Sequence, residues 1–208
     1  SPLGPWEYKG HIMDHTKRTR GNHPGIIDYK GRSYVFGLNY DIMHLDTYVH
    51  HERRSVSAAE MHYNADGTIQ EVPYFMDAVL EQIGSFNPFR KVEAETMAWG
   101  YGLKTDMIRN RGIVVTDMDE GEYIEVKGVD FKKGASAFTA TLAASGAGSI
   151  EIHLDSTEGP LAGTVKVTPT SGEYKDFACP VKGASGVHDI FLVFKGECRF
   201  KFDFWRFR

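Results

Sequence analysis

The sequence predicts an all-β protein, and two observations support this fold class. Two short runs rich in β-branched and aromatic residues, 26–29 and 32–37, flank Lys30-Gly31, which is a two-residue hairpin signal. From Phe89 onward, about eight to ten short strand-like runs are separated by Gly-rich turns, a pattern typical of β-sandwiches. One segment, Tyr74–Ile83, has the apolar spacing of a helix. We therefore expect sheets with one short helix.

The first part of the chain is expected to be an incomplete domain. Arg54–Tyr63 is predicted to be one long strand, and residues 64–68 form a turn after it. Gly84–Pro88 has the composition of a linker, which divides the chain into residues 1–87 and 88–208. A small sheet with one helix and few large apolar residues is marginally stable alone, so residues 1–87 need a further partner.

Composition and charge exclude several classes of protein. The chain has 208 residues, of which 41% are hydrophobic and 25% charged, as in ordinary globular domains. A net charge of -4 without a basic block argues against nucleic-acid binding. No run approaches the roughly 18 apolar residues that span a membrane. Cys179 and Cys198 are too few for a disulfide framework; we expect two thiols, with pairing left open.

Two acidic segments near the ends of the second part suggest a metal site. Lys91–Thr96 and Phe200–Phe207 both have strand patterns, in which Glu93 and Glu95 share one face. If the two strands pair, Asp203 joins these two carboxylates. Three carboxylates repel one another unless a cation lies among them, and oxygen-only ligands favour calcium. A solvated acidic edge is the alternative that spacing alone leaves open.

The sequence between these segments resembles the family 6 carbohydrate-binding modules. Four stretches carry the resemblance in the family's order: Val92-Glu93-Ala94-Glu95, Gly121–Phe131, Ser149–Asp155 and Gly186–Gly196. The resemblance covers roughly Phe89 to Arg208 and implies a β-sandwich of jelly-roll topology with a structural calcium. It assigns Glu93, Glu95 and Asp203 as side-chain ligands of the ion, with backbone carbonyls near Lys104–Asp106 completing the shell.

The first part resembles the last blade of the five-bladed β-propeller of family 43 glycoside hydrolases. The resemblance rests on Ser1-Pro2-Leu3-Gly4-Pro5-Trp6, Gly21–Ile26, Arg53-Arg54-Ser55-Val56 and Tyr63–Thr68. It places a histidine of the central active-site cavity, which helps to hold a water or metal, on His23. It places a sugar-contacting arginine on Arg54, in preference to its neighbour Arg53. The expected fold is thus a partial propeller, its final blade, followed by the sandwich.

The resemblance assigns no catalytic residue to this chain. Glycosidases need an acid and a base held across the scissile bond, and in family 43 the aspartate base, a second aspartate and the glutamate acid come from earlier blades. The chain begins with Ser1 and has no signal-peptide pattern. We therefore expect the catalytic carboxylates to lie outside this chain, and the chain alone to be inactive.

The resembled module family binds sugar at two surfaces. The loop-tip site uses two aromatic side chains and an asparagine; the second aromatic aligns with Phe177, and Tyr174 lies near it. The first aromatic position falls near Asp117 and the asparagine on Lys201, so two of the three elements are absent. The second surface is a concave sheet face, for which Trp99, Tyr101 and Tyr123 are candidates, although strand aromatics also form cores. We retain Tyr174, Phe177 and Trp99 as carbohydrate-binding candidates.

The expected function is the C-terminal portion of a hemicellulose-degrading glycoside hydrolase, of the α-L-arabinofuranosidase or β-xylosidase type. Its expected partners are arabinoxylan or xylan and the missing N-terminal propeller portion, and its expected location is secreted or extracytoplasmic. The alternative is a stand-alone carbohydrate-binding or structural β-sandwich protein. A stand-alone module has no need of Gly21–Arg54, which favours the hydrolase.

Overall fold

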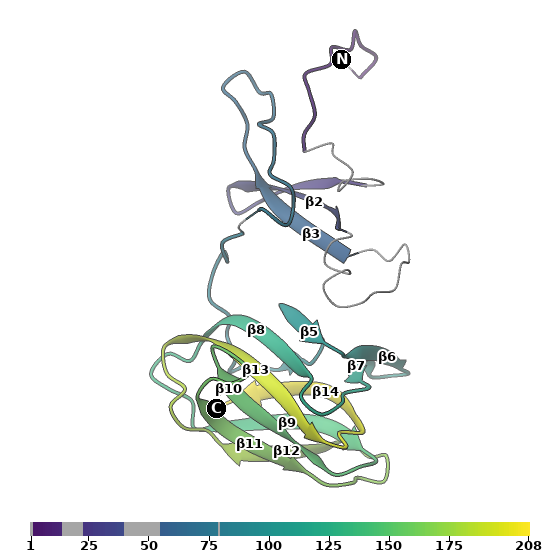
Figure 1. Ribbon diagram of the computed structural model, residues 1–208, viewed down its shortest axis with the longest axis vertical. Helices are drawn as coiled ribbons and strands as arrows, with labels where there is room; N and C mark the ends of the chain where they lie inside the picture. The colour runs from purple at the N-terminus through teal and green to yellow at the C-terminus, as the bar shows by residue number, and fades with distance from the viewer. Residues whose placement is uncertain (1, 14–22, 40–54, 79) are drawn as a thin grey trace. The chain divides into compact units, whose positions relative to one another are not determined.

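The computed structural model describes residues 2–13, 23–39, 55–78 and 80–208 (Figure 1). The chain divides into two compact units, residues 1–81 and 82–208. All elements of regular structure in the described residues are β-strands, which confirms the all-β fold class. No helix in this part of the chain could cross a membrane.

The N-terminal unit contains a three-stranded antiparallel sheet in the order β1-β2-β3, formed by β1 (Gly25–Tyr29), β2 (Arg32–Asn39) and β3 (Ser55–Met61). Tyr29 pairs with Arg32, and the intervening Lys30 and Gly31 have φ angles of 50° and 79°. Two successive positive φ angles are typical of the type I′ hairpin turn, whose twist matches that of the flanking strands. The predicted hairpin is therefore confirmed.

One face of this sheet packs against the segment that follows it. Val35, Ala59 and Met61 point to this face and form a small buried cluster with Val72 and Phe75. The Tyr74 hydroxyl donates to the buried Asn39 side-chain oxygen at 3.1 Å. The segment after the sheet is thus held by these side chains and by two isolated backbone bridges, Tyr63 with Ile69 and Met13 with Val72.

The predicted helix over Tyr74–Ile83 is wrong. Residues 75–77 form a single turn, and the Asp77 amide donates to the Tyr74 carbonyl at 2.8 Å. Of the apolar stripe of the expected helix, Phe75 is buried, whereas Leu80 and Ile83 are exposed and cover no apolar surface. A helix this short needs tertiary packing to be stable, and here it lacks that packing.

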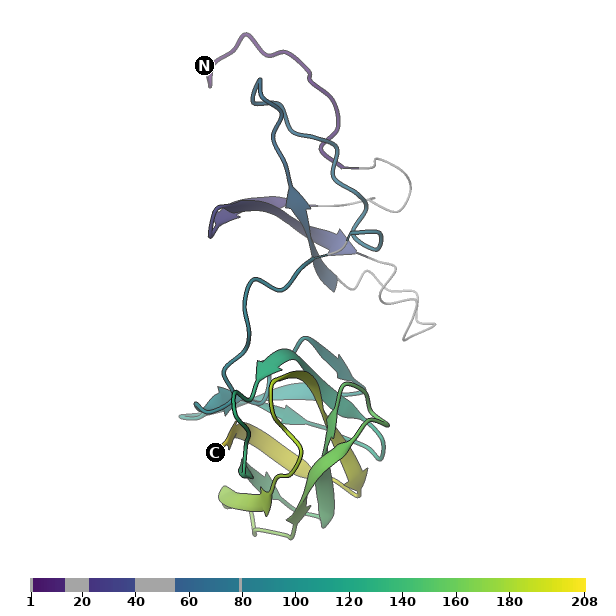
Figure 2. The same ribbon diagram turned by 90° about the vertical axis from the view of Figure 1, so that its left-hand side faces the viewer.

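The second unit is a β-sandwich, as predicted. Its first sheet has the order β11-β10-β13-β8-β5 and its second the order β12-β9-β14-β7-β6, with β4 also paired to β14 (Figures 1 and 2). The strands are β4 (Val92–Glu93), β5 (Trp99–Tyr101), β6 (Lys104–Ile108), β7 (Gly112–Thr116), β8 (Tyr123–Asp130), β9 (Ala137–Ala144), β10 (Gly148–Leu154), β11 (Leu161–Val167), β12 (Lys175–Pro180), β13 (Val187–Gly196) and β14 (Phe200–Phe207).

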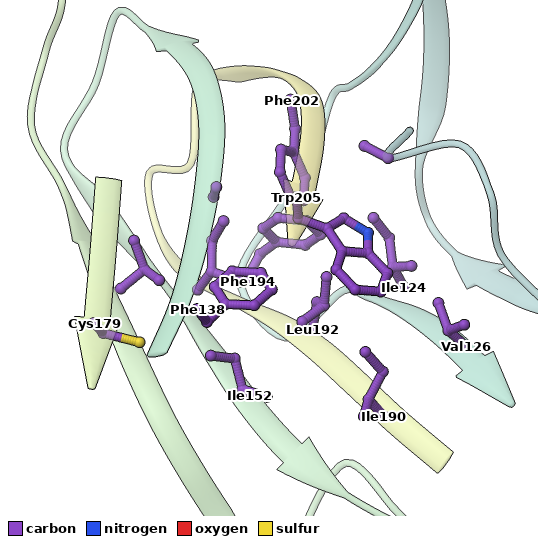
Figure 3. Packing of buried hydrophobic residues seen from close by; sticks show 14 of the residues in the cluster. Ile124, Val126, Phe138, Ile152, Cys179, Ile190, Leu192, Phe194, Phe202 and Trp205 are labelled. Carbon is purple, nitrogen blue, oxygen red and sulfur yellow. The ribbon is translucent and has the colours of Figure 1, made fainter. Parts of the chain in front are cut away.

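Alternating apolar residues of both sheets fill the core of the sandwich. Side chains such as Ile152 and Leu192 from the first sheet face Phe138, Phe202 and Trp205 from the second (Figure 3). The Trp205 ring lies 5.9 Å from the Phe138 ring and is fully buried. Since apolar area removed from water drives folding, this cluster is the main source of stability in the unit.

The segment predicted to be a linker belongs to the sandwich. Phe86 forms a parallel bridge with Val129, its amide donates to the Gly128 carbonyl at 2.7 Å, and its carbonyl accepts from the Asp130 amide at 2.8 Å. The Phe86 ring also lies 6.2 Å from the Trp205 ring. The boundary between the two compact units accordingly falls between residues 81 and 82, before the predicted boundary between residues 87 and 88.

Both cysteines are free and buried. Burial raises the pKa of the Cys179 and Cys198 thiols, which keeps them protonated at neutral pH. They therefore act as small apolar side chains, as expected from the sequence.

We predict that Phe86→Ala destabilises the sandwich by about 1–2 kcal/mol, because the side chain is half-buried against the core. Urea unfolding of the full chain, followed by tryptophan fluorescence, measures this loss. Phe89→Ala is the matched control, since Phe89 is exposed, and it should change stability by less than about 0.5 kcal/mol. Equal effects of the two substitutions would show that the segment around Phe86 is only a linker.

Candidate functional site

A cavity of about 1160 Å³ lies where several loops and strand ends of the second unit meet. Residues from the start of β6, the end of β7, the end of β9, the approach to β12 and the β13–β14 turn form its wall. They include Lys104, Thr105, Asp106, Asp117, Asp119, Ser145, Tyr174, Glu197, Arg199 and Lys201. We call this the loop-end cavity. This volume lies slightly above the range of about 300–1,000 Å³ for small-molecule sites, so the cavity can take an oligosaccharide segment.

Two ion pairs line one side of the loop-end cavity. Lys104 Nζ lies 3.3 Å from Asp117 Oδ2, and Lys201 Nζ lies 3.6 Å from Asp106 Oδ2. Lys104 and Asp106 are two residues apart on β6 and therefore share a face. These side chains are exposed, so each pair contributes only about 0–1 kcal/mol and can open to bind another group. Ammonium donors and carboxylate acceptors together suit a ligand rich in hydroxyl groups.

Tyr174 supplies an aromatic surface to the same cavity. The Arg111 guanidinium lies over the Tyr174 ring, 3.7 Å from its centroid, and Arg111 Nη1 donates to the Asp203 carboxylate. Burial raises the pKa of Tyr174, and the Arg111 charge acts in the opposite direction. The Tyr174 hydroxyl is buried and has no hydrogen-bond partner among the described residues.

The structure separates the predicted sugar-binding residues. Tyr174 lines the loop-end cavity, whereas Phe177 is partly buried against the core and is not part of the cavity wall. Trp99 lies on β5 opposite Glu125 of β8, on the outer face of the other sheet. These three residues therefore do not form one site.

The outer face around Trp99 is a second aromatic surface. Tyr101 stacks on Tyr123 with ring centroids 5.8 Å apart and an interplanar angle of 18°. Tyr123 also contacts Phe191, whose ring centroid lies 5.6 Å away. Ile124 and Val126 alternate with Tyr123 and Glu125 along β8 and point into the core, so the aromatic row faces away from it.

Arg111 was not predicted from the sequence. It lies in the turn between β6 and β7, flanked by Asn110 at φ 66° and Gly112 at φ 112°. No periodic pattern marks such a position, because its role depends on β14 and on Tyr174, which are distant in sequence. The Asn-Arg-Gly turn is itself recognisable, but it predicts a backbone bend and not a side-chain contact.

Two of the three predicted calcium ligands, Glu93 and Asp203, lie on paired strands. Glu93 of β4 is opposite Phe204 of β14, and the Ala94 amide donates to the Asp203 carbonyl at 2.8 Å. Glu95 lies in the turn that follows β4, so the strand predicted over Lys91–Thr96 ends at Glu93 and its expected alternation does not reach Glu95. One carboxylate oxygen of Glu95 is buried without a hydrogen-bond partner in the described chain. Such an oxygen fits the role of a cation ligand, since a buried acceptor without a partner is costly.

The other two carboxylates have cationic partners within the protein. Glu93 Oε1 lies 2.9 Å from Lys91 Nζ, and Asp203 is paired with Arg111. Across residues 2–13, 23–39, 55–78 and 80–208, no three acidic, histidine or cysteine side chains are grouped so as to hold a metal ion. The predicted backbone ligands, residues 104–106, pair with β7 and line the loop-end cavity. The calcium site stays a prediction.

The two residues predicted for the propeller cavity are in the N-terminal unit. His23 is exposed and lies two positions before β1. Arg54, with its neighbour Arg53, lies outside the described residues. Their roles stay predictions.

Comparison with known proteins identifies the second unit. Residues 93–208 match carbohydrate binding module family 6. The chain belongs to this family. A family 6 module from Clostridium cellulolyticum, solved in complex with xylose, is 34% identical to this chain, with a TM-score of 0.55. The match covers 59% of this chain and 99% of that module. The predicted module is therefore confirmed.

The comparisons also cover the N-terminal unit. An arabinoxylan arabinofuranohydrolase of Bacillus subtilis (strain 168) is 35% identical over 235 residues, which cover 100% of this chain and 43% of the relative. A crystal structure of a family 43 arabinoxylan arabinofuranohydrolase from Bacillus subtilis, in complex with cellotetraose, matches with 34% identity and a TM-score of 0.89. That match covers 100% of this chain and 45% of the solved chain. The chain thus spans less than half the length of these hydrolases.

Proposed function

We propose that this chain is the C-terminal portion of an enzyme that removes arabinose from arabinoxylan, and that its family 6 module binds the xylan-type polysaccharide. The observation that carries the proposal is the match to arabinoxylan arabinofuranohydrolases over the whole chain, including the N-terminal unit. A stand-alone carbohydrate-binding protein would need only the second unit.

Within the intact enzyme, we propose that this chain completes the active-site cavity rather than supplying the reacting carboxylates. Inverting hydrolysis needs two carboxyl groups about 6.5–9.5 Å apart, one acting as acid and the other as base. The resemblance places neither on this chain. His23 would lie at the cavity, and Arg54 would donate hydrogen bonds to hydroxyl groups of the bound sugar.

The N-terminal unit has a sheet face suited to docking against preceding blades. Ile27, Phe36 and Val56 lie on the face opposite Val35 and are 52%, 41% and 73% exposed. Apolar side chains that cluster on one sheet face mark an interaction surface. We assign this face to contact with the preceding part of the propeller.

In the module, the loop-end cavity is the proposed polysaccharide site. Tyr174 offers an aromatic surface for the C–H groups of a sugar ring, while Lys201 and Asp106 can exchange their exposed ion pair for hydrogen bonds to hydroxyl groups. A similar module binds xylose, which supports a xylan-type ligand. The row formed by Trp99, Tyr101 and Tyr123 is a second surface for the same polymer.

A structural module without sugar affinity is the second candidate function. It is favoured by the core position of Phe177 and by the lysine at 201 in place of the family's asparagine. In that case the second unit would only support the catalytic propeller, and the loop-end cavity would bind no sugar.

Calcium would bind between β4 and β14 if the predicted ligands hold it. Asp203 uses one carboxylate oxygen for Arg111, and a carboxylate has a second oxygen for an ion. Glu95 contributes its buried oxygen and Glu93 its exposed carboxylate, released from Lys91. When bound, the ion would tie the first strand of the module to the last. We further propose that the enzyme acts outside the cytoplasm, where polymeric xylan is found.

We predict that the full chain binds xylohexaose and that Tyr174→Ala weakens this binding by about tenfold, because the ring surface is lost. Isothermal titration calorimetry measures the affinity. Phe89→Ala, at an exposed aromatic side chain outside both proposed surfaces, is the matched control and should bind as the wild type does. Trp99→Ala tests the outer sheet face. Loss of binding in the Trp99 variant alone would move the site to the outer sheet face, and an absence of binding by the wild type would favour the structural module.

We predict that the isolated 208-residue chain hydrolyses no aryl arabinofuranoside, whereas in the intact enzyme Arg54→Ala lowers kcat/KM by roughly 10- to 100-fold. A charged donor to a hydroxyl contributes about 1.5–3 kcal/mol, which corresponds to this range. Arg53→Ala is the control and should retain activity. Full activity of the Arg54 variant would refute its assignment to sugar contact.

We predict that calcium raises the melting temperature of the module, because an ion that binds only the folded state stabilises it by mass action. Saturation to about 100 times Kd corresponds to about 2.7 kcal/mol. Asp203→Ala should remove most of the response, whereas Glu158→Ala, an exposed control, should retain it. Identical melting curves in calcium and in excess chelator would show that the three carboxylates hold no ion.

A further inference from the structure

Three side chains connect the middle of β14 to the wall of the loop-end cavity. Asp203 is almost fully buried, with a side chain 3% exposed, whereas the Arg111 side chain is 34% exposed. Arg111 donates to Asp203 and its guanidinium lies 3.7 Å from the centroid of the Tyr174 ring. Tyr174 in turn lines the cavity, whereas Arg111 does not.

We propose that Arg111 is a positioning residue, which fixes Tyr174 as a single aromatic wall for the sugar. This inference rests on the proposed carbohydrate binding at the loop-end cavity. Since the guanidinium covers one face of the ring, a sugar can stack only on the opposite face.

The anchor of this arrangement is rigid. Asp203 lies in β14, and its carbonyl accepts a hydrogen bond from the Ala94 amide. Arg111 is held at its backbone as well, because its amide donates to the Ile108 carbonyl at 3.0 Å in the β6–β7 turn. Arg111 is thus held both at its backbone and at its guanidinium before a ligand arrives.

The chemistry of arginine suits this role better than that of lysine. A guanidinium is planar, so it can stack on an aromatic face while its edge donates to a carboxylate. A lysine ammonium can keep the charge pair with Asp203 but presents no plane to the Tyr174 ring. A fixed ring loses less conformational freedom when a sugar stacks on it, which favours binding.

The test compares Arg111→Met and Arg111→Lys with the wild-type full chain, by calorimetric titration with xylohexaose and by thermal unfolding. We expect Arg111→Met to weaken binding by roughly 3- to 30-fold, the range expected for loss of a cation–π contact. Arg111→Lys should keep the wild-type melting temperature but lose affinity, because the lysine keeps the charge pair with Asp203 and lacks the plane that stacks on Tyr174. Arg109→Met, an exposed neighbour, is the matched control and should bind as the wild type does.

The outcomes separate this inference from the proposed function. Wild-type affinity in Arg111→Met, with binding lost in Tyr174→Ala, would overturn the positioning role while carbohydrate binding stands. Restoration of affinity by Arg111→Lys would overturn the stacking role. If the wild type itself binds no xylohexaose, both the proposed site and the role of Arg111 fall.

Discussion

The pairing of the last strand, β14, with β9, β7 and β4 is the constraint on which the sandwich depends. Phe200, Phe202, Trp205 and Phe207 of this strand all point into the core. The register of β14 against β9 shifts between Phe202 and Phe204. Such a bulge inserts a residue and re-aims the side chains around it. Here it keeps Trp205 inside and leaves Asp203 available to Arg111, so core packing and the cavity wall are set by one local irregularity.

The same strand contributes side chains both to the core and to the loop-end cavity. Lys201, two residues before Asp203, lines the loop-end cavity and pairs with Asp106. The C-terminal end of β14 closes the core through Trp205, over which Phe86 also packs. A polar site built on a strand so strongly held is pre-organised, which reduces the cost of ordering its side chains on binding.

Local patterns predicted much of the fold because they act over a few residues. The hairpin at Lys30-Gly31 follows from a turn that needs positive φ, and the strands of the sandwich follow from their alternation. The helix over Tyr74–Ile83 failed because its apolar spacing had no surface to cover. Simple alternation along β14 would place Phe204 inside and Trp205 outside, and the bulge reverses this. The centroid of the Phe204 ring instead lies 4.3 Å from Lys91 Nζ.

The candidate site was less predictable, because it joins residues distant in sequence. Tyr174 was identified through family resemblance, but Phe177 was assigned to the same site although it packs on the core. Arg111 carries no sequence signal for its contact with Tyr174. A crystal structure of the chain soaked with xylohexaose would show whether the loop-end cavity binds xylan through Tyr174. We expect a sugar ring stacked on the face of Tyr174 opposite Arg111, within hydrogen-bond distance of Lys201. Xylohexaose bound only on the outer face around Trp99 and Tyr101 would contradict it.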